Sequence, residues 1–458
     1  MKERLKTAII VILIISGITQ VGILWSYQSQ GTPTGFFTGL FGLNGAQPIS
    51  DKLVRERLFE PDRLILSDGS SSYWIVEDGG REHSALWSEA ANGLKKIVSG
   101  DVKLVKSSDS WANATQRRGV LLDFGYAMDS GLLAWFLGAV NPSGDIPDIR
   151  KLMVNRDIID EYKSVFYIYG SDGAVYSSEP ISYDGAMNLN EAINNVSMAS
   201  RKYSSLGAGK IAKENDEPDV LYALSQYWQY SELSVIPFIQ WSNGGHGDEL
   251  ASIIIGAEKD RYNRRVVSGD ALQFSYGDNI YRYHDDGYLT YRYLRDTYPS
   301  GKDQIGKALL NAYKFVAAIN DRVENTAAIT LTSVETLSEG VYQFGFDYKV
   351  DGMPIKVGID TKDRKLDHAI SIQADSSRVL KCDWLLKRFM EGAQSSYNDR
   401  FIDLLESSGT FFPDLRIQDI LSCYVIEDSS KELLKPALLI RTKDQRDLVI
   451  EMIPGEGD

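Results

Sequence analysis

Residues 341–359 read VYQFGFDYKVDGMPIKVGI, and this stretch predicts a tight β-hairpin. The dipeptide Asp351-Gly352 favours a two-residue turn, because both residues tolerate the positive φ angles that such turns require. The turn sets the register of the flanking strands, so that apolar side chains lie opposite one another. The predicted pairs are Tyr348–Ile355, Phe346–Val357 and Phe344–Ile359.

The segments around this hairpin predict a helix packed on an antiparallel sheet. Before it, residues 305–323 carry apolar side chains at spacings of three and four, which is typical of an amphipathic helix. Ser300 and Asp303 signal the start of that helix. After the hairpin, residues 366–372 are expected to add a third strand to the meander. A weaker copy of this order follows, with a helix near Phe401 and strands near 417–426, 437–442 and 448–453, which is compatible with a structural repeat.

Upstream of residue 300 the pattern mixes strands and helices. Apolar runs at 64–66 and 73–76 flank a Ser-Asp-Gly-Ser turn at 67–70, and the run at 165–169 leads into Ser171-Asp172-Gly173. Both arrangements predict hairpins. Residues 132–137 and 221–228 are expected to be helical.

A further hairpin is predicted between residues 279 and 293, with 285–287 as a three-residue loop and Gly287 in the left-handed conformation. The expected pairs are Tyr281–Tyr291 and Tyr283–Leu289. One face is then aromatic, and the other carries Arg282, His284 and Arg292. Tyrosine and arginine often anchor interfaces, so these three side chains are a candidate protein-interaction surface. The alternative, which we favour, is that the aromatic face is core and the arginines face water.

The amino end predicts a membrane anchor, because residues 7–50 contain no charged side chain. Residues 7–27 are mostly apolar, and at about 1.5 Å per residue they make a helix that crosses the roughly 30 Å hydrocarbon layer. Lys2, Arg4 and Lys6 outnumber Glu3 before this span, which places residues 1–6 in the cytoplasm and the rest of the chain outside the cell. Trp25 and Tyr27 would then lie at the membrane interface.

The alternative to an anchor is a cleavable signal peptide, with Ser29-Gln30-Gly31 as the cleavage site. The apolar run is longer than such peptides usually have, so we favour the uncleaved anchor. Within the span, Ser16, Thr19 and Gln20 share one helical face, the arrangement that hydrogen-bonds a partner helix in lipid. The bland alternative is that three mildly polar residues are tolerated there.

These patterns predict an α+β protein with a single N-terminal transmembrane helix and a multi-domain extracytoplasmic region. We expect a cytoplasmic head at 1–6, the span at 7–27 and a stalk rich in Gly, Pro and Phe at 28–50. An α+β domain is expected at 51–300, followed by two helix-on-sheet domains at 301–380 and 381–458.

Composition and motifs exclude several classes of function. Asp and Glu total 63 against 49 Lys and Arg, giving a formal charge of −14, which disfavours nucleic acid as a partner. Cys382 and Cys423 are too few for a disulfide framework or a four-thiolate zinc site, although one bridge between them is left open. Residues 301–308 resemble a phosphate-binding loop but lack its Ser or Thr, and Asp123-Phe124-Gly125 lacks the other kinase motifs. The four histidines are scattered. We therefore predict no catalytic, cofactor-binding or metal-binding residue.

Together the basic head, the span ending ILWSYQ at residue 28, the acidic exterior and two further stretches resemble the YycH family. The stretches are residues 274–293, similar to the family's turn followed by a Leu-Thr-Tyr strand, and Val350 to Ile355, similar to its Gly-x-Pro hairpin. That family comprises membrane-anchored regulators of an essential cell-wall two-component system in low-GC Gram-positive bacteria.

The resemblance implies a non-enzymatic protein that contacts a sensor histidine kinase through its transmembrane helix and its extracytoplasmic domains. It also implies a smaller YycI-like paralogue as a partner, whose helix-on-sheet domains resemble the last two expected here. Homo- and hetero-oligomers are both compatible with this arrangement. Two other classes remain open, namely an anchored cell-wall hydrolase with an unidentified carboxylate pair, and a binding module released by cleavage near Gly31.

Overall fold

The computed structural model describes fourteen stretches of the chain, namely residues 50–139, 146–157, 163–182, 189–206, 220–224, 227–239, 247–255, 263–268, 271–295, 304–323, 325–360, 365–407, 416–443 and 447–455. The predicted head, span and nearly all of the stalk lie outside these residues. None of the helices within the described stretches is both long and apolar enough to cross a bilayer. The mixture of helices and sheets confirms the α+β class.

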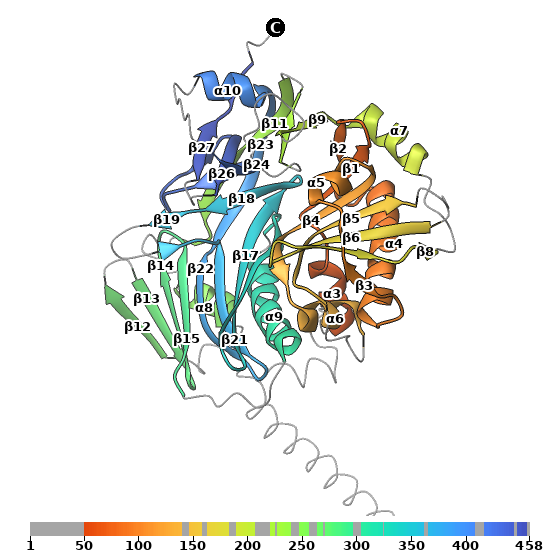
Figure 1. Cartoon of the computed structure of the whole chain (residues 1–458). Helices are drawn as coiled ribbons and strands as arrows, with labels where there is room; N and C mark the ends of the chain where they lie inside the picture. Colours follow the sequence, from red (N-terminus) through yellow and green to blue (C-terminus); the bar gives the residue numbers. More distant parts are fainter. Residues whose placement is uncertain are drawn as a thin grey trace, which may run out of the picture.

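Ten described strands between residues 63 and 223 form the first sheet, which is coloured orange to yellow-green in Figure 1. Its order is β10-β9-β2-β1-β4-β5-β6-β7-β3, with β8 beside β6, and every pair is antiparallel. The strands are β1 (Arg63–Asp68), β2 (Tyr73–Ile75), β3 (Leu104–Lys106), β4 (Arg118–Met128), β5 (Ile149–Arg156), β6 (Lys163–Gly170), β7 (Val175–Ser178), β8 (Ile181–Ser182), β9 (Lys202–Ser205) and β10 (Leu221–Ala223). The predicted hairpins β1–β2 and β6–β7 are confirmed.

Both faces of the first sheet are covered, because apolar side chains alternate along its buried strands. Leu64 and Leu66 of β1 belong to the main core with helices α3 (Asp51–Leu58), α4 (Arg81–Val98) and α6 (Ser130–Leu137). Ile65 points to the opposite face, where it packs with Trp111 of the short helix α5 (Trp111–Thr115). Helix α7 (Leu189–Ala199) lies beside β1 and β2.

The second sheet contains twelve described strands from residues 263–451, in the order β12-β13-β14-β15-β22-β21-β17-β18-β24-β26-β27, with β16 on the edge of β17. The strands are β12 (Asn263–Ser268), β13 (Ala271–Tyr276), β14 (Asn279–His284), β15 (Tyr288–Tyr293), β16 (Ala328–Ser338), β17 (Val341–Val350), β18 (Met353–Val357), β21 (Ile370–Asp375), β22 (Val379–Leu385), β24 (Ile417–Ile426), β26 (Ala437–Thr442) and β27 (Leu448–Glu451). Helix α9 (Ile305–Val323) packs on β21 and β17 and against helix α8 (Gly247–Ile255). This position confirms the predicted helix on a sheet.

A third, four-stranded sheet links distant parts of the sequence. Its order is β25-β11-β23-β28, where β11 is Tyr227–Pro237, β23 is Lys387–Asn398, β25 is Leu433–Leu434 and β28 is Ile453–Pro454. A separate short pair joins β19 (Ile359–Asp360) to β20 (Lys365–Leu366). Helix α10 (Phe401–Ser407) packs with β24 and β26 in a core of its own.

The hairpin predicted at residues 341–359 is confirmed at its turn, but the strand pairs farther from the turn differ from the prediction. Asp351 and Gly352 have φ values of 47° and 74°, and Tyr348 lies opposite Ile355 as predicted. The two outer predicted pairs are wrong, since Phe344 and Phe346 lie opposite residues of β21 instead. The physical reason is that β18 diverges from β17 after three pairs and forms a parallel pair with β24, which leaves the edge of β17 open to β21.

The other local predictions are largely confirmed. The hairpin β14–β15 has both expected pairs, and Gly287 has a φ of 88°. Helices occupy 305–323 and 130–137. The predicted helix at 221–228 is wrong. Its described residues are extended in β10 and β11, because Leu221 and Ala223 alternate into a core beside β9.

The expected domain boundaries do not coincide with sheet boundaries. Strands β12–β15 precede residue 300, yet β15 pairs with β22, which itself contains the expected boundary at 380/381. Strands from both predicted helix-on-sheet units share one sheet through β18 and β24. How the chain divides into independently folding units therefore stays a prediction.

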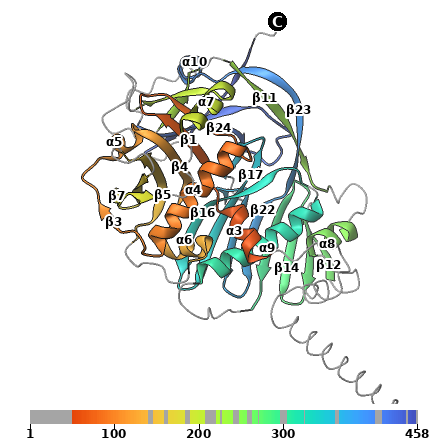
Figure 2. The same ribbon diagram turned by 90° about the vertical axis from the view of Figure 1, so that its right-hand side faces the viewer.

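The first and second sheets are joined by a layer of helices, visible in the centre of Figure 2. Helix α6 contacts α4 on one side and α9 on the other, and α3 contacts both α6 and α9. One hydrophobic cluster runs without a break from the first sheet through these helices to the second sheet. The two sheets are thus held together by a shared core.

We predict that Gly306→Ala destabilises this shared core. A Cβ at position 306 of α9 would overlap with the Trp135 indole of α6. Overpacking of this kind costs about 1–3 kcal/mol, against a gain of up to about 1 kcal/mol in helix propensity. We expect the free energy of unfolding to fall by roughly 1–2 kcal/mol in urea denaturation. Gly358→Ala, where the added Cβ meets open space, is the matched control and should change it by less than about 0.5 kcal/mol. Equal effects of the two changes would contradict the tight α6–α9 contact.

Candidate functional site

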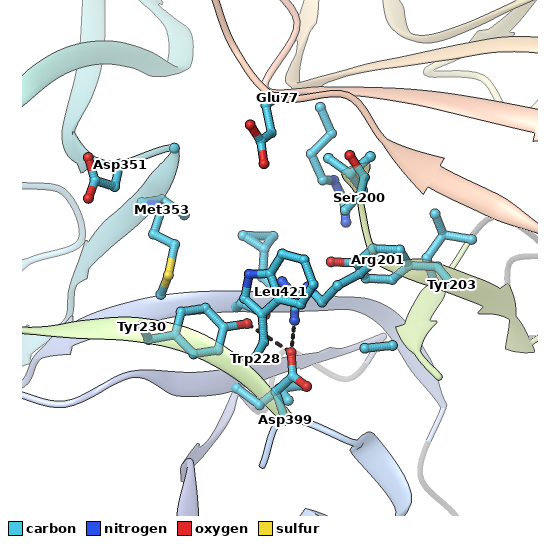
Figure 3. A pocket seen from close by; sticks show the side chains of 18 of the residues that line it. Glu77, Ser200, Arg201, Tyr203, Trp228, Tyr230, Asp351, Met353, Asp399 and Leu421 are labelled. Atoms are coloured by element: carbon cyan, nitrogen blue, oxygen red, sulfur yellow. Dashed lines mark hydrogen bonds and ion pairs between the residues drawn. The ribbon is translucent and has the colours of Figure 1, made fainter. Parts of the chain in front are cut away.

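A cavity of about 620 Å³ lies where the first sheet meets the third sheet and the carboxy-terminal strands (Figure 3). One side is built from the end of β2 and from β9 and β10. The other side is built from β11, β24 and the turn between β17 and β18. Because these elements come from both halves of the sequence, the cavity exists only when the halves are assembled.

The floor of the cavity is an ion pair between Arg201 and Asp399, drawn in Figure 3. Asp399 follows directly on β23, and its side chain is 0% exposed. The Tyr230 hydroxyl of β11 donates a hydrogen bond of 2.8 Å to Oδ2 of Asp399. Its Oδ1 is also buried and has no hydrogen-bond partner within the described residues. This oxygen has no accessible surface, so it lies beneath the cavity rather than facing its open space.

Three aromatic rings surround the guanidinium group of Arg201. Its Cζ lies 5.5 Å from the ring centre of Tyr203, 4.9 Å from that of Trp228 and 5.4 Å from that of Tyr230. Aromatic faces attract cations at such distances. The cavity wall is thus an environment that stabilises positive charge, and Arg201 already occupies part of it.

The rim of the cavity is acidic. Lys349 pairs with Asp78 at 2.5 Å, whereas Asp62 and Glu77 form no ion pair within the described residues. In Figure 3 the Glu77 carboxylate points toward the centre of the cavity. Burial and the charge of Asp78 raise the pKa of the nearby Glu60 carboxyl. The rim therefore carries more negative than positive charge.

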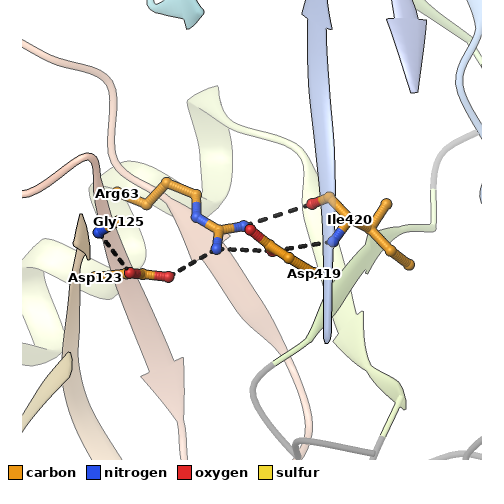
Figure 4. A network of polar contacts seen from close by, with 5 residues as sticks. All are labelled: Arg63, Asp123, Gly125, Asp419 and Ile420. Atoms are coloured by element: carbon orange, nitrogen blue, oxygen red, sulfur yellow. Dashed lines mark hydrogen bonds and ion pairs between the residues drawn. The ribbon is translucent and has the colours of Figure 1, made fainter. Parts of the chain in front are cut away.

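Arg63 joins the two halves of the molecule beside this cavity (Figure 4). Its Nη2 lies 2.8 Å from Oδ2 of Asp123 on β4 and 2.9 Å from Oδ1 of Asp419 on β24. Backbone N–H groups complete the network, because Gly125 donates to Asp123 and Ile420 donates to Asp419, each at 2.9 Å.

Burial and charge oppose each other in this network. Burial alone would lower the pKa of Arg63, but Asp419 and Asp123 raise it well above its usual range. Burial alone would raise the pKa of Asp123, but Lys151 and Arg63 hold it well below its usual range. Arg63 and Asp123 are therefore both charged at neutral pH.

Another buried carboxylate, Asp347, lies on β17, and β18 separates that strand from the β24 strand of Asp419. Its Oδ2 is 2.9 Å from Nζ of Lys356, and its Oδ1 accepts a 3.0 Å hydrogen bond from the Ala369 N–H. Burial alone would raise the pKa of Asp347, but Lys356 and His368 hold it well below its usual range. This carboxylate is therefore ionised and bound on both oxygens.

The chemistry of these groups is that of ion pairing. Among the residues that the structure describes, no group of three or more His, Cys, Asp or Glu is placed to hold a metal ion. Cys382 and Cys423 are both free and buried, which answers the question of a bridge between them. Burial raises the pKa of the Cys423 thiol to about 12 and that of Cys382 well above its usual value, so both are neutral thiols.

The predicted site residues fall into two groups. Ser16, Thr19, Gln20, Trp25 and Tyr27 lie outside the described residues. The second group is brought together by the structure on one face of β14 and β15, and consists of Arg282, His284 and Arg292.

The environment of that second group is polar. Arg282 is exposed and donates to Gln273, and Arg292 pairs with Asp383 at 3.3 Å. On the opposite face, Tyr281 and Tyr291 are buried against Phe315 of α9. The aromatic face is therefore core, as favoured from the sequence, and whether the polar face binds a partner stays a prediction.

Sequence reasoning missed the cavity and its charged groups. Asp123 was considered only as part of the Asp-Phe-Gly triplet. A usable signal did exist, because Asp123, Asp347 and Asp419 each stand within apolar strands, and a buried charge requires a partner. The identity of that partner is not encoded locally.

The comparisons with known proteins bear on the fold. No family model matches the chain, and no curated protein matches it either. A crystal structure of YycH from Bacillus subtilis is similar, with a TM-score of 0.57 and 11% identity over 88% of this chain and 96% of that one. An uncharacterized protein from Eubacterium rectale has a TM-score of 0.31 at 14% identity, over 49% of this chain and 82% of that one. The chain thus has a YycH-like fold.

We predict that Arg63→Leu destabilises the protein by about 3–5 kcal/mol, because it leaves Asp123 and Asp419 buried without their cation. Replacing all three residues (Arg63→Leu, Asp123→Asn, Asp419→Asn) should recover part of the loss, since the two carboxylates that Arg63 neutralised are then uncharged. Urea unfolding at pH 7 measures both. A triple variant no more stable than Arg63→Leu would contradict the ion-pair explanation.

We also predict an acid-sensitive contribution from Asp347. Its pKa is lowered in the folded state, so its stabilisation is complete above the unfolded value of about 4 and is lost as the pH falls below it. Asp347→Asn should therefore have a lower free energy of unfolding than the parent at pH 7. The difference between the two free energies should shrink by roughly 1.4 kcal/mol for each pH unit below about 4. Unfolding midpoints at pH 7, 5 and 3 test this. Asp367 is exposed, so Asp367→Asn is the control, and its free energy of unfolding should be close to that of the parent at all three pH values.

Proposed function

We propose that this chain is a non-enzymatic, membrane-anchored regulator of a sensor histidine kinase in a cell-wall two-component system. The observation that carries the proposal is the YycH-like fold, which extends over 88% of the chain. The sequence resemblance to the YycH family supports it independently, because that resemblance rests on the amino-terminal span and two short stretches rather than on the fold.

The proposed anchor is the uncharged stretch at residues 7–27, with Trp25 and Tyr27 at the membrane interface. This anchor would place the protein in the cell membrane as a single-pass protein, with residues 1–6 in the cytoplasm and the bulk of the chain outside the cell. We propose that Ser16, Thr19 and Gln20 face helices of the kinase or of a YycI-like paralogue, because polar side chains in lipid gain most from hydrogen bonds to a neighbouring helix.

The proposed extracytoplasmic contact is the polar face of β14 and β15. Arg282 is exposed there, and arginine is enriched at protein interfaces. In this proposal, the exterior domains bias the kinase between two signalling states through contacts that differ between them. Charged groups in the molecule's interior support a body of fixed shape for this task, because each buried network described above joins separate strands.

We predict that replacing Ser16, Thr19 and Gln20 with Leu keeps the protein in the membrane but lowers co-purification with the kinase by roughly tenfold. The loss follows from removing the interhelical hydrogen bonds, which are worth about 0.6 kcal/mol each on average. Detergent pull-down of the full chain, with identification of the bound membrane proteins, is the measurement. The matched control changes Ile14, Ile18 and Val21 to Leu on the opposite helical face and should leave association intact. Unchanged association of the first variant would refute the assigned face.

A further inference from the structure

The second sheet ends in two strands whose outer edges are unpaired within the described part of the chain. β12, at the lower left of Figure 1, pairs with β13 alone, and β27 pairs with β26 alone. The terminal strands of the first and third sheets are only two or three residues long, whereas β12 has six residues and β27 has four. Native proteins usually keep exposed edges short, because the free N–H and C=O groups of an edge strand bind further strands. These two longer edges are therefore available for pairing.

The two edges carry complementary side chains. β12 contains two arginines and no acidic residue, and its exposed Arg265 has no ion pair within the described residues. Beside it, Val266 is 58% exposed. β27 contains the exposed Glu451 and no basic residue, and Ile450 precedes this carboxylate. One edge is thus basic and the other acidic, and each has a β-branched side chain next to its charge.

The directions of the two strands allow a second copy to continue the sheet. Between β12 and β27 only the step from β18 to β24 is parallel, and the other nine steps are antiparallel. An odd number of reversals means that β12 and β27 run in opposite directions. A second copy placed in the same orientation beside the first therefore brings its β27 antiparallel to β12.

The charged side chains of the two edges lie on the same face of the sheet. Residues directly opposite each other on neighbouring strands point to the same side. The registered pairs place Arg265 on the face of Asp347, and they place Glu451 on the face of Lys356, the ion-pair partner of Asp347. The antiparallel register that sets Arg265 opposite Glu451 also sets Val266 opposite Ile450. Charge and apolar surface are thus matched in one register.

We propose that a second copy of this chain docks its β27 on β12 as an antiparallel strand, with Arg265 opposite Glu451. Each copy has one edge of each kind, so the contact repeats head to tail. Pairing of β12 with β12, or of β27 with β27, brings like charges together and is disfavoured. This inference goes beyond the proposed regulatory function, and neither depends on the other.

Sedimentation velocity of the full chain in detergent, over a range of concentrations, tests the contact. We expect dimers and longer assemblies to increase with concentration. Arg265→Glu and Glu451→Arg should each raise the dissociation constant roughly tenfold, because an attraction across the strand pair becomes a repulsion. Both side chains are exposed, so folding should be unaffected. Arg388→Glu reverses an equally exposed arginine on β23 of the third sheet and is the control, with an expected change of less than about twofold.

Mixing the two charge-reversal variants separates this contact from any other. In the mixture, the Glu at position 265 of one variant meets the Arg at position 451 of the other, and the unchanged Glu451 meets the unchanged Arg265. Self-association should therefore return to nearly the parent level. A chain that stays monomeric at every concentration, or an association that neither reversal weakens, overturns the proposal.

Cross-linking through introduced cysteines tests the register. Val266→Cys and Ile450→Cys, prepared separately, should form a covalent dimer with a short thiol-specific cross-linker only when they are mixed. The native Cys382 and Cys423 are buried and should not react. An equal yield from Val266→Cys alone would show pairing of β12 with itself and would overturn the assigned edge. Because kinase association is not measured in these experiments, their failure leaves the proposed regulatory function untouched.

Discussion

The arrangement of the two halves depends on Arg63, a buried cation shared by carboxylates of two different sheets. Its own strand and Asp123 belong to the first sheet, whereas Asp419 comes from β24 of the second. A buried guanidinium is tolerated only with its partners in place. Sliding or rotating one sheet against the other would separate Arg63 from one carboxylate and leave a charge without compensation. The hydrophobic effect brings the sheets together, but it is not directional. The ion pairs select one relative position among many that would bury similar apolar area.

The cavity follows from this same junction. Helices α3, α4, α6 and α9 fill the space between the first and second sheets, so that the core is continuous there. Near the end of β2 the described elements that line the cavity are the strands β9, β10, β11 and β24, the turn at Asp351-Gly352 and Phe401 of helix α10. Their facing surfaces carry charged and aromatic side chains, which do not pack into a dry core. The Arg201–Asp399 pair and the rings around it close the floor, and the space above them stays open.

Local physics explains which parts of this structure could be predicted from the sequence. The Asp351-Gly352 turn, the β14–β15 hairpin and helix α9 each follow from residues close together in the chain, and all three are present. Pairings between segments that are distant in the sequence could not be predicted from it. Nothing near residue 355 indicates that β18 leaves its hairpin partner to pair in parallel with Tyr424, and nothing near Arg63 indicates Asp419. The helix expected at 221–228 failed for the same reason, since a strand partner at 202–205 decided its conformation.

The position of the cavity links its chemistry to the proposed regulatory role. Its lining comes from both halves of the molecule, so a ligand bound there would contact strands of the first sheet and of the third. A ligand held there would stabilise the one arrangement of the halves that the Arg63 ion pairs select, because it contacts both halves only when they are assembled. The same ion pairs make any other arrangement costly, since a separated pair leaves buried charge without compensation. The junction therefore keeps the molecule in a single shape, which is what contacts with a partner protein require.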